Sequence, residues 1–223
     1  QSTWRLTTGL YLEGTFEPLP GTVFTPGLRV EGYLLDAEPH VSLEPRFAGS
    51  VELVPGDWGT MLKVAAGSFS RPPDPDELAA MRAAGASLSP KQALHIQGGM
   101  EQRVGDRLTF TSTLFSIWRD DLTTRSHAFP IPERLGELPV YDGGSGHSFG
   151  AEALVRIGVP RRYFAWLTYS LVRNERTDGE SPLAVPYAYV APFDTTHLLG
   201  AVGQVHLPWG FRLGARYRVA TGM

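Results

Sequence analysis

The chain has 223 residues, 42% of them hydrophobic and 19% charged, and a formal net charge of -3. That charge offers no basic stripe, so we expect no nucleic-acid partner. The absence of cysteine excludes disulfide frameworks, thiolate metal sites and thiol catalysis. No apolar run approaches the roughly 18 residues of a membrane helix. The 25 glycines and 18 prolines suit many strands joined by turns better than they suit helices.

The first predicted element covers residues 4–16, where even positions are mostly apolar and odd positions mostly polar. Trp4, Leu6, Leu10 and Leu12 share one face of this segment. A strand in a soluble sheet is typically about 5–6 residues long, whereas a tilted strand that crosses a membrane needs about 9–11. The length of the alternation therefore favours a membrane-crossing strand.

The same alternation recurs along the rest of the chain. In the segment 108–117, Phe115 and Ile117 switch face, for which we predict a β-bulge. One such segment alone would fit a soluble antiparallel sheet with one wet face equally well. With the first segment, the series predicts about ten long antiparallel strands, the later ones at 24–34, 43–53, 62–66, 94–101, 108–117, 149–157, 163–171, 199–207 and 211–219.

The connections between these segments alternate between two classes. Tight turns are expected at 18–21, 56–58, 105–106, 159–161 and 208–210. Longer connections are expected at 36–42, 70–93, 120–147 and 174–194. Outer-membrane barrels have this organisation, with short periplasmic turns and long extracellular loops. The sequence therefore predicts an all-β fold, a portion of an antiparallel transmembrane β-barrel in which the strands form a meander.

Two local features add detail to this prediction. Asp74 as N-cap, Pro75 at the first helical position and Gly85 as a stop predict a short helix within the first long connection. Aromatic residues near strand ends are predicted to form the interface girdles of a barrel: Trp4, Phe16, Trp58, Phe69, Trp118, Phe164 and Trp209.

The sequence contains no pattern typical of a catalytic or metal site. None of the six histidines has the spacing of a helical metal-binding pair, so no metal and no cofactor are predicted. The run 143–148 lacks the final glycine of a hydrolase nucleophile elbow and is better interpreted as a loop tip. We therefore expect no enzyme. Charges on the polar side of the segments are assigned to a wet barrel interior: Arg46, Glu101, Glu152, Arg156, Arg212, Arg216 and Arg218.

An ordered series of motifs resembles the barrel of TonB-dependent receptors. Residues 24–31 (FTPGLRVE) resemble the family's PGLR strand, and residues 43–47 (LEPRF) resemble the strand that follows it. The series continues through 67–73, 89–95, 115–122 and 150–152, and ends with 214–222 (GARYRVATG). Phe69 and Arg71 depart from the family's pattern.

The resemblance implies an outer-membrane receptor that takes up a scarce nutrient such as a ferric siderophore. It implies the outer-membrane bilayer, a plug domain of the same protein, TonB and a small-molecule ligand as partners. Residues 1–223 are expected to be a partial barrel, without the plug and the final strands. Substrate contacts are expected in the extracellular loops, at Arg125, His127, Tyr187 and Tyr189.

Two other functions remain open from the sequence. A passive porin or diffusion channel has the same strand pattern. A soluble, secreted β-protein also shows alternating strands.

Overall fold

The computed structural model describes residues 5–35, 38–83, 88–125, 140–178, 188–191 and 194–221. In these residues twelve strands form one antiparallel sheet, with one α-helix and one 3-10 helix in the described connections. The elements are β1 (Arg5–Glu13), β2 (Phe16–Leu19), β3 (Thr22–Leu35), β4 (Glu38–Val54), β5 (Thr60–Arg71), α1 (Pro75–Ala83), β6 (Lys91–Val104), β7 (Leu108–Arg125), β8 (Val140–Val159), β9 (Tyr163–Thr177), β10 (Ala188–Val190), β11 (His197–His206), η1 (Pro208–Gly210) and β12 (Arg212–Thr221).

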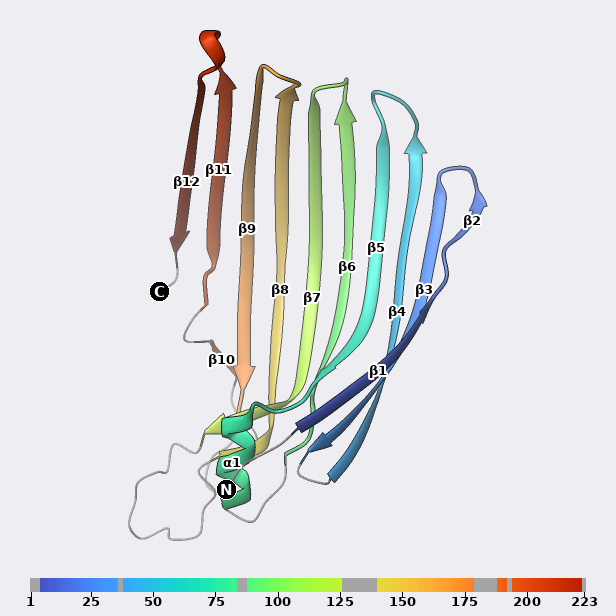
Figure 1. Cartoon of the computed structure of the whole chain (residues 1–223), viewed down its shortest axis with the longest axis vertical. Coiled ribbons are helices and arrows are strands. Elements are labelled where there is room, and N and C mark those ends of the chain that lie inside the picture. Colours follow the sequence, from blue (N-terminus) through green and yellow to red (C-terminus); the bar gives the residue numbers. More distant parts are fainter. Residues whose placement is uncertain are drawn as a thin grey trace.

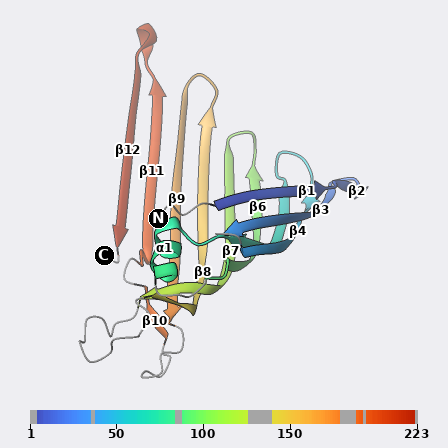
Figure 2. The same ribbon diagram turned by 60° about the horizontal axis from the view of Figure 1, so that its bottom comes forward.

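The strands form a meander in which each long strand pairs with the next long strand. The order is β1-β3-β4-β5-β6-β7-β8-β9-β11-β12, while the short β2 and β10 pair only with β3 and β9. This path corresponds to the predicted segments one for one and confirms the predicted all-β fold. Within the described residues β1 and β12 are edge strands, so the sheet is an arc with two free edges (Figure 2).

The two ends of the sheet differ in their connections (Figure 1). At the end that we call the turn end, tight turns join β4 to β5, β6 to β7, β8 to β9 and β11 to β12. Gly56 and Gly105 take φ values of 89° and 64° in two of these turns, a backbone conformation that favours glycine. The opposite end, which we call the loop end, carries α1 and the longer connections.

The two faces of the sheet differ in polarity. Cross-strand pairs such as Leu10↔Val30 and Leu114↔Ala151 place apolar side chains together on one face, which we call the apolar face. Leu10 is 77% exposed and Leu114 67% exposed on this face. A soluble monomer rarely leaves so continuous an apolar surface open to water, whereas a barrel in a membrane faces lipid with it.

Several strands are long enough to extend beyond a bilayer. The strands β4, β7 and β8 have 17, 18 and 20 residues, compared with the about 9–11 residues that one crossing needs. The predicted loops 120–147 and 174–194 are therefore partly strand: β7 continues to Arg125, β8 begins at Val140, and β9 continues to Thr177. Alternation disappears there because both faces of the sheet are polar above the apolar band.

The predicted bulge in segment 108–117 is wrong. Pairing of β7 with β8 runs without a break from Leu108↔Ile157 to Arg119↔Gly146, and the irregularity comes later, where Asp121 has a φ of 57°. The hydrophobic character of Phe115 and Ile117 is therefore not the result of a slip of the strand. They are hydrophobic residues on the polar face, where Phe115 pairs with Gly150.

The predicted loop helix is confirmed as α1, which begins at Pro75 and has Asp76 and Glu77 in its first turn. Asp74 precedes it, and its backbone N–H donates to Glu77 Oε2 over 2.9 Å, a capping-box contact. Gly85 lies outside the described residues. None of the described helices combines the length and apolar character needed to cross a membrane.

Candidate functional site on the polar face

Four side chains form a row across the polar face near the loop end, which we call the cation–aromatic row: Arg46 of β4, Phe69 of β5, His95 of β6 and Arg119 of β7. The strand register brings these residues together, because Arg46 pairs with Gly67, Gly67 with His95, and Ala93 with Arg119.

The Phe69 ring contacts both Arg46 and His95 and so connects these members of the row. The Arg46 guanidinium carbon lies 5.0 Å from the centre of the Phe69 ring, a cation–π contact. The centre of the Phe69 ring lies 4.6 Å from that of the His95 ring. The row thus presents two guanidinium groups and two rings on one polar surface, which suits an anionic ligand with flat groups.

Strands β4 and β5 separate at the level of the cation–aromatic row. Pairing of β4 with β5 stops at Arg46↔Gly67, while β5 goes on pairing with β6 as far as Arg71. The backbone N–H of Ser70 is left without a strand partner and donates instead to Glu44 Oε1 over 2.8 Å. Glu44 is only 2% exposed and also accepts from Arg46 Nη2 over 3.0 Å. These contacts fix the position of Arg46 in the row.

A hydrogen-bonded chain continues from the row across β7, β8 and β9. Arg119 Nη1 donates to Ser148 Oγ over 2.7 Å, and Ser148 Oγ donates to Asn174 Oδ1 over 2.5 Å. Asn174 donates from its backbone N and its Nδ2 to Asp194 Oδ1, over 2.9 and 2.7 Å. The chain therefore ties the connection between β10 and β11 to the polar face.

Asp194 is the anchor of this chain and is 4% exposed. Burial by itself would raise the pKa of its carboxyl group. Hydrogen bonds from Thr196 and Asn174, together with the nearby charge of Arg173, outweigh burial and hold the pKa of Asp194 below its ordinary value. The carboxylate form thus stabilises this connection.

Helix α1 covers the polar face at the loop end. It follows β5 along the chain, yet it contacts β8, three strands further along the sheet. Lys91 Nζ donates to Glu77 Oε1 and Oε2 over 2.8 and 2.7 Å, which fastens the helix to the start of β6. Leu78 of the helix and Leu88 after it are buried. The helix therefore has a defined place beside the row.

Burial and hydrogen bonding act in opposite directions on the pKa of the Glu77 carboxyl group, as they do on that of Asp194. Burial alone would raise its pKa, but the hydrogen bonds from Lys91 and from the Asp74 backbone lower the pKa below its ordinary value. Glu77 is charged when it holds Lys91.

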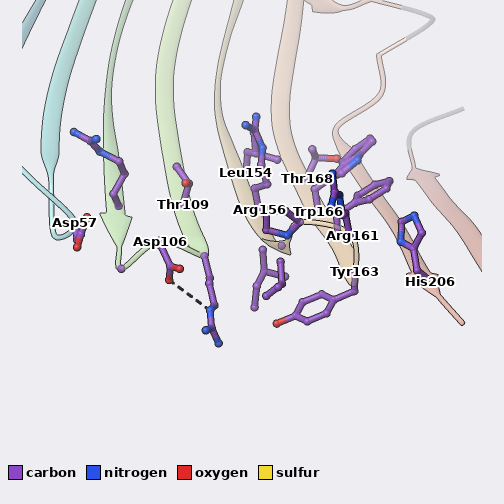
Figure 3. Close-up of a pocket in the computed structure, with 18 residues that line it drawn as sticks. Asp57, Asp106, Thr109, Leu154, Arg156, Arg161, Tyr163, Trp166, Thr168 and His206 are labelled. Atoms are coloured by element: carbon purple, nitrogen blue, oxygen red, sulfur yellow. Dashed lines mark ion pairs between the residues drawn. The ribbon is translucent and has the colours of Figure 1, made fainter. Parts of the chain in front are cut away.

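A concave region lies at the turn end, between the turns that follow β6 and β8 (Figure 3). The hollow has a volume of about 970 Å³. Arg156 and Trp166, a cross-strand pair, line it together with Arg161 and His206. Asp106 and Arg107 form an exposed ion pair of 3.4 Å at its rim. The hollow lies at the opposite end of the sheet from the loops.

The structure describes only part of the predicted substrate site. Arg125 ends β7, and nothing is described of its side chain. His127 and Tyr187 lie outside the described residues. Tyr189 lies in β10 and donates from its hydroxyl to Asp178 Oδ1 over 2.9 Å.

Sequence reasoning missed most of the row. Arg46 was assigned to the interior by alternation, but Phe69 was assigned to an interface girdle and lies on the polar face instead, as does Phe164. Trp4, another predicted girdle residue, lies outside the described residues. Within the part of the chain that the structure describes, no group of three His, Asp or Glu side chains could hold a metal ion.

Comparison with known proteins decides the family. The model of the family described as "TonB dependent receptor-like, beta-barrel" matches residues 2–223. The chain belongs to this family. TonB-dependent receptor barrels are receptors and transporters of the outer membrane, and the family is not one of enzymes. Comparison with curated proteins gives no match.

Solved structures of similar fold include receptors and a transporter for iron compounds. The ferric-catecholate import receptor Fiu from E. coli K12 superposes with a TM-score of 0.73 at 14% identity, over 96% of this chain and 34% of that chain. The FrpB iron transporter from Neisseria meningitidis gives 0.73 at 14%, over 96% and 32%. The pyoverdine receptor FpvA from Pseudomonas aeruginosa gives 0.72 at 14%, over 96% and 31%. This TonB-dependent receptor barrel chain spans about a third of each of these structures.

Proposed function

We propose that this chain is a section of the barrel wall of an outer-membrane TonB-dependent receptor that takes up a scarce nutrient such as a ferric siderophore. The match of the family model over residues 2–223 carries the proposal. The similar structures include receptors for a ferric catecholate and for pyoverdine, which supports an iron chelate as the ligand. The remaining strands and a plug domain would come from other parts of the same polypeptide.

The cation–aromatic row is the proposed place of ligand contact within this chain. Iron chelates with catecholate or carboxylate groups are anionic, and guanidinium groups bind such oxygens strongly and often bidentately. Phe69 and His95 offer flat surfaces at the same level. The residues Arg125, His127, Tyr187 and Tyr189 remain proposed ligand contacts.

The hollow at the turn end is proposed to face the plug domain. It lies on the polar face, which a closed barrel would turn inward, and it is far from the loops where a ligand would enter. We propose that TonB supplies the energy for uptake and that the chain has no catalytic role.

Iron-limited bacteria that produce the complete receptor provide the test. Accumulation of a radiolabelled ferric chelate should require the receptor gene, and it should stop when TonB is removed. Uptake that continues without TonB would instead show a passive channel and would contradict the proposal. A matched strain that lacks only the receptor gives the background.

A further inference from the structure

A buried hydrogen-bond network joins β3, β4 and β5 beside the cation–aromatic row. Beyond Gly67 the end of β5 bends away from β4 (Figure 1). Ser70 in this part of β5 contacts Tyr33 of β3, although β4 lies between β3 and β5 in the sheet. Tyr33 and Glu44 are each only 2% exposed. The end of β5 thus encloses a polar network on the polar face of β3 and β4.

The hydroxyl group of Tyr33 connects the two sides of this network. On the β3 side it donates to Glu31 Oε2, while the other oxygen of Glu31 forms an ion pair with Arg29. On the β5 side the hydroxyl lies 2.8 Å from Ser70 Oγ and 3.3 Å from the Ser70 carbonyl oxygen. Glu31 is buried, so loss of the hydroxyl would leave a buried carboxylate oxygen without its donor among the described residues.

Ser70 limits how Arg46 can bind Glu44. Ser70 donates from its backbone N–H and from Oγ to Glu44 Oε1, each over 2.8 Å. Arg46 Nη2 donates to the other oxygen, Oε2, over 3.0 Å. Guanidinium and carboxylate groups often form two parallel bonds, but here Ser70 occupies one of the two oxygens. A single bond lets the guanidinium group lie over the Phe69 ring, 5.0 Å from its centre.

One nitrogen of Arg46 stays open as a result. Nε is shielded from solvent and has no partner, and Nη2 is bonded to Glu44. No described residue bonds Nη1, and the Arg46 side chain is 38% exposed. Nη1 is therefore the group that can donate to an anionic ligand.

We propose that Tyr33 is a positioning residue for ligand binding, which keeps Ser70 on Glu44 and so keeps Arg46 bound through one bond and open to an anionic chelate. The inference rests on the proposed function of the cation–aromatic row. Tyr33 is buried and contacts no ligand itself; it acts through Arg46.

The loss of the Tyr33 hydroxyl has a defined consequence. In Tyr33→Phe the hydroxyl of Ser70 can turn from Glu44 to the buried Glu31, which has lost its donor. Arg46 then replaces that contact and takes both oxygens of Glu44. The second bond draws the guanidinium group away from the aromatic ring of the row and occupies the nitrogen that the ligand needs.

Crystal structures of variants of the complete receptor test the positioning directly. Tyr33→Phe keeps the ring and should show Arg46 forked on Glu44 and displaced from Phe69. Ser70→Ala removes the Oγ donor itself and should give the same movement, which keeps the test decisive if Tyr33→Phe folds poorly. Arg46 that stays over Phe69 with one bond to Glu44 would overturn the proposal.

Equilibrium titration with ferric pyoverdine and with a ferric triscatecholate tests the consequence for binding. Tyr33→Phe should bind about three- to ten-fold more weakly, as expected for one hydrogen bond. Tyr217→Phe is the matched control, because its exposed hydroxyl on the apolar face of β12 has no partner among the described residues. Its affinity should equal that of the wild type, and equal losses in the two variants would contradict a positioning role.

A double variant separates action through Arg46 from a general structural effect. Arg46→Gln should weaken binding by about ten-fold or more. Adding Tyr33→Phe to it should cause no further loss, because residues that act through one another are not additive. Losses that multiply would show that Tyr33 acts by another route. A wild-type receptor that binds neither chelate would count against the proposed ligand class, and the position of Arg46 in Tyr33→Phe would still decide this inference.

Discussion

Lys91 and Glu77 fasten the loop helix to the sheet: the ammonium group donates to both carboxylate oxygens, over 2.8 and 2.7 Å. Lys91 is the first residue of β6, and Glu77 lies in the first turn of α1. The contact therefore holds α1 beside the cation–aromatic row.

Replacing Lys91 by methionine should loosen α1 without unfolding the sheet. A partly buried, hydrogen-bonded ion pair of this kind contributes about 1–2 kcal/mol to the local stability. Amide hydrogen exchange in residues 78–83 should speed up by about ten-fold, while exchange in β6 and β7 stays unchanged. Lys63→Met, on a more exposed ion pair with Glu101, is the control. Unchanged exchange in α1 would show that the pair does not hold the helix.

The same ion pair should weaken in acid. The pKa of Glu77 is lowered in the folded state, so its contribution is present above the ordinary carboxyl value of about 4.3. That contribution is lost as the pH falls through the lowered pKa. Hydrogen exchange in α1, corrected for the intrinsic pH dependence, should therefore rise as the pH falls through the lowered pKa in the wild type, and should rise less in Lys91→Met, where only the Asp74 contact to Glu77 remains. A parallel response in both proteins would contradict this assignment.

Asp194→Asn should release the connection between β10 and β11. The carboxylate accepts from Asn174 and Thr196; an amide could still accept from Asn174 and donate to the Thr196 hydroxyl, but it would carry no charge. We expect a local loss of about 2 kcal/mol, typical of a buried charged acceptor. Limited proteolysis near residues 188–196 would report it. Asp106→Asn, at the exposed turn, should behave as the wild type; cleavage that is equal in both variants would argue against an anchoring role.

Phe69→Leu should weaken binding of an anionic iron chelate. It removes the ring that Arg46 and His95 contact and preserves most of the volume. The loss of aromatic and cation–π contacts predicts about 5- to 20-fold weaker binding. Phe164→Leu changes the same residue type on the polar face at the turn end and should leave the affinity unchanged. Titration of the purified complete receptor would measure both, and equal affinities of the two variants would exclude the row as a contact.

Gly150→Ala should impair folding. A Cβ at Gly150 would collide with the backbone carbonyl oxygen of Leu171, which cannot move without breaking the sheet. Overpacking of this kind costs about 1–3 kcal/mol. Gly98→Ala is the control, because its added Cβ would meet no other atom nearer than 3.9 Å. Heat-modifiable mobility on gels should show less folded barrel for Gly150→Ala only, and a loss in both variants would show that alanine itself is poorly tolerated.

The sequence predicted the strands better than the site, for a physical reason. Alternation reports which face of a strand meets lipid, so it found the long strands of the meander. It could not find β2 and β10, which have 4 and 3 residues. It also failed above the apolar band, where both faces of β7 and β8 are wet.

The row depends on register, which alternation does not report. A two-residue shift in the register of neighbouring strands would separate Arg46, His95 and Arg119 while keeping every side chain on its face. Phe69 shows the other limit of the sequence, because an aromatic residue near a strand end suits an interface girdle as well as a polar-face contact. Asp194 gave no signal at all, since its partners Asn174 and Thr196 are ordinary polar residues in the sequence.

The orientation of the strands across the outer membrane is the central claim, and cysteine labelling tests it most directly. The chain has no cysteine, so in a complete receptor whose other cysteines are replaced, Asp76→Cys in α1 and Asp106→Cys in a tight turn give single reporters. In intact cells, a membrane-impermeant maleimide should label the complete receptor at Asp76→Cys only, and Asp106→Cys should react only after the outer membrane is opened. Labelling of both positions in intact cells, or of Asp106→Cys alone, would contradict a wall that crosses the membrane with its loop end outside.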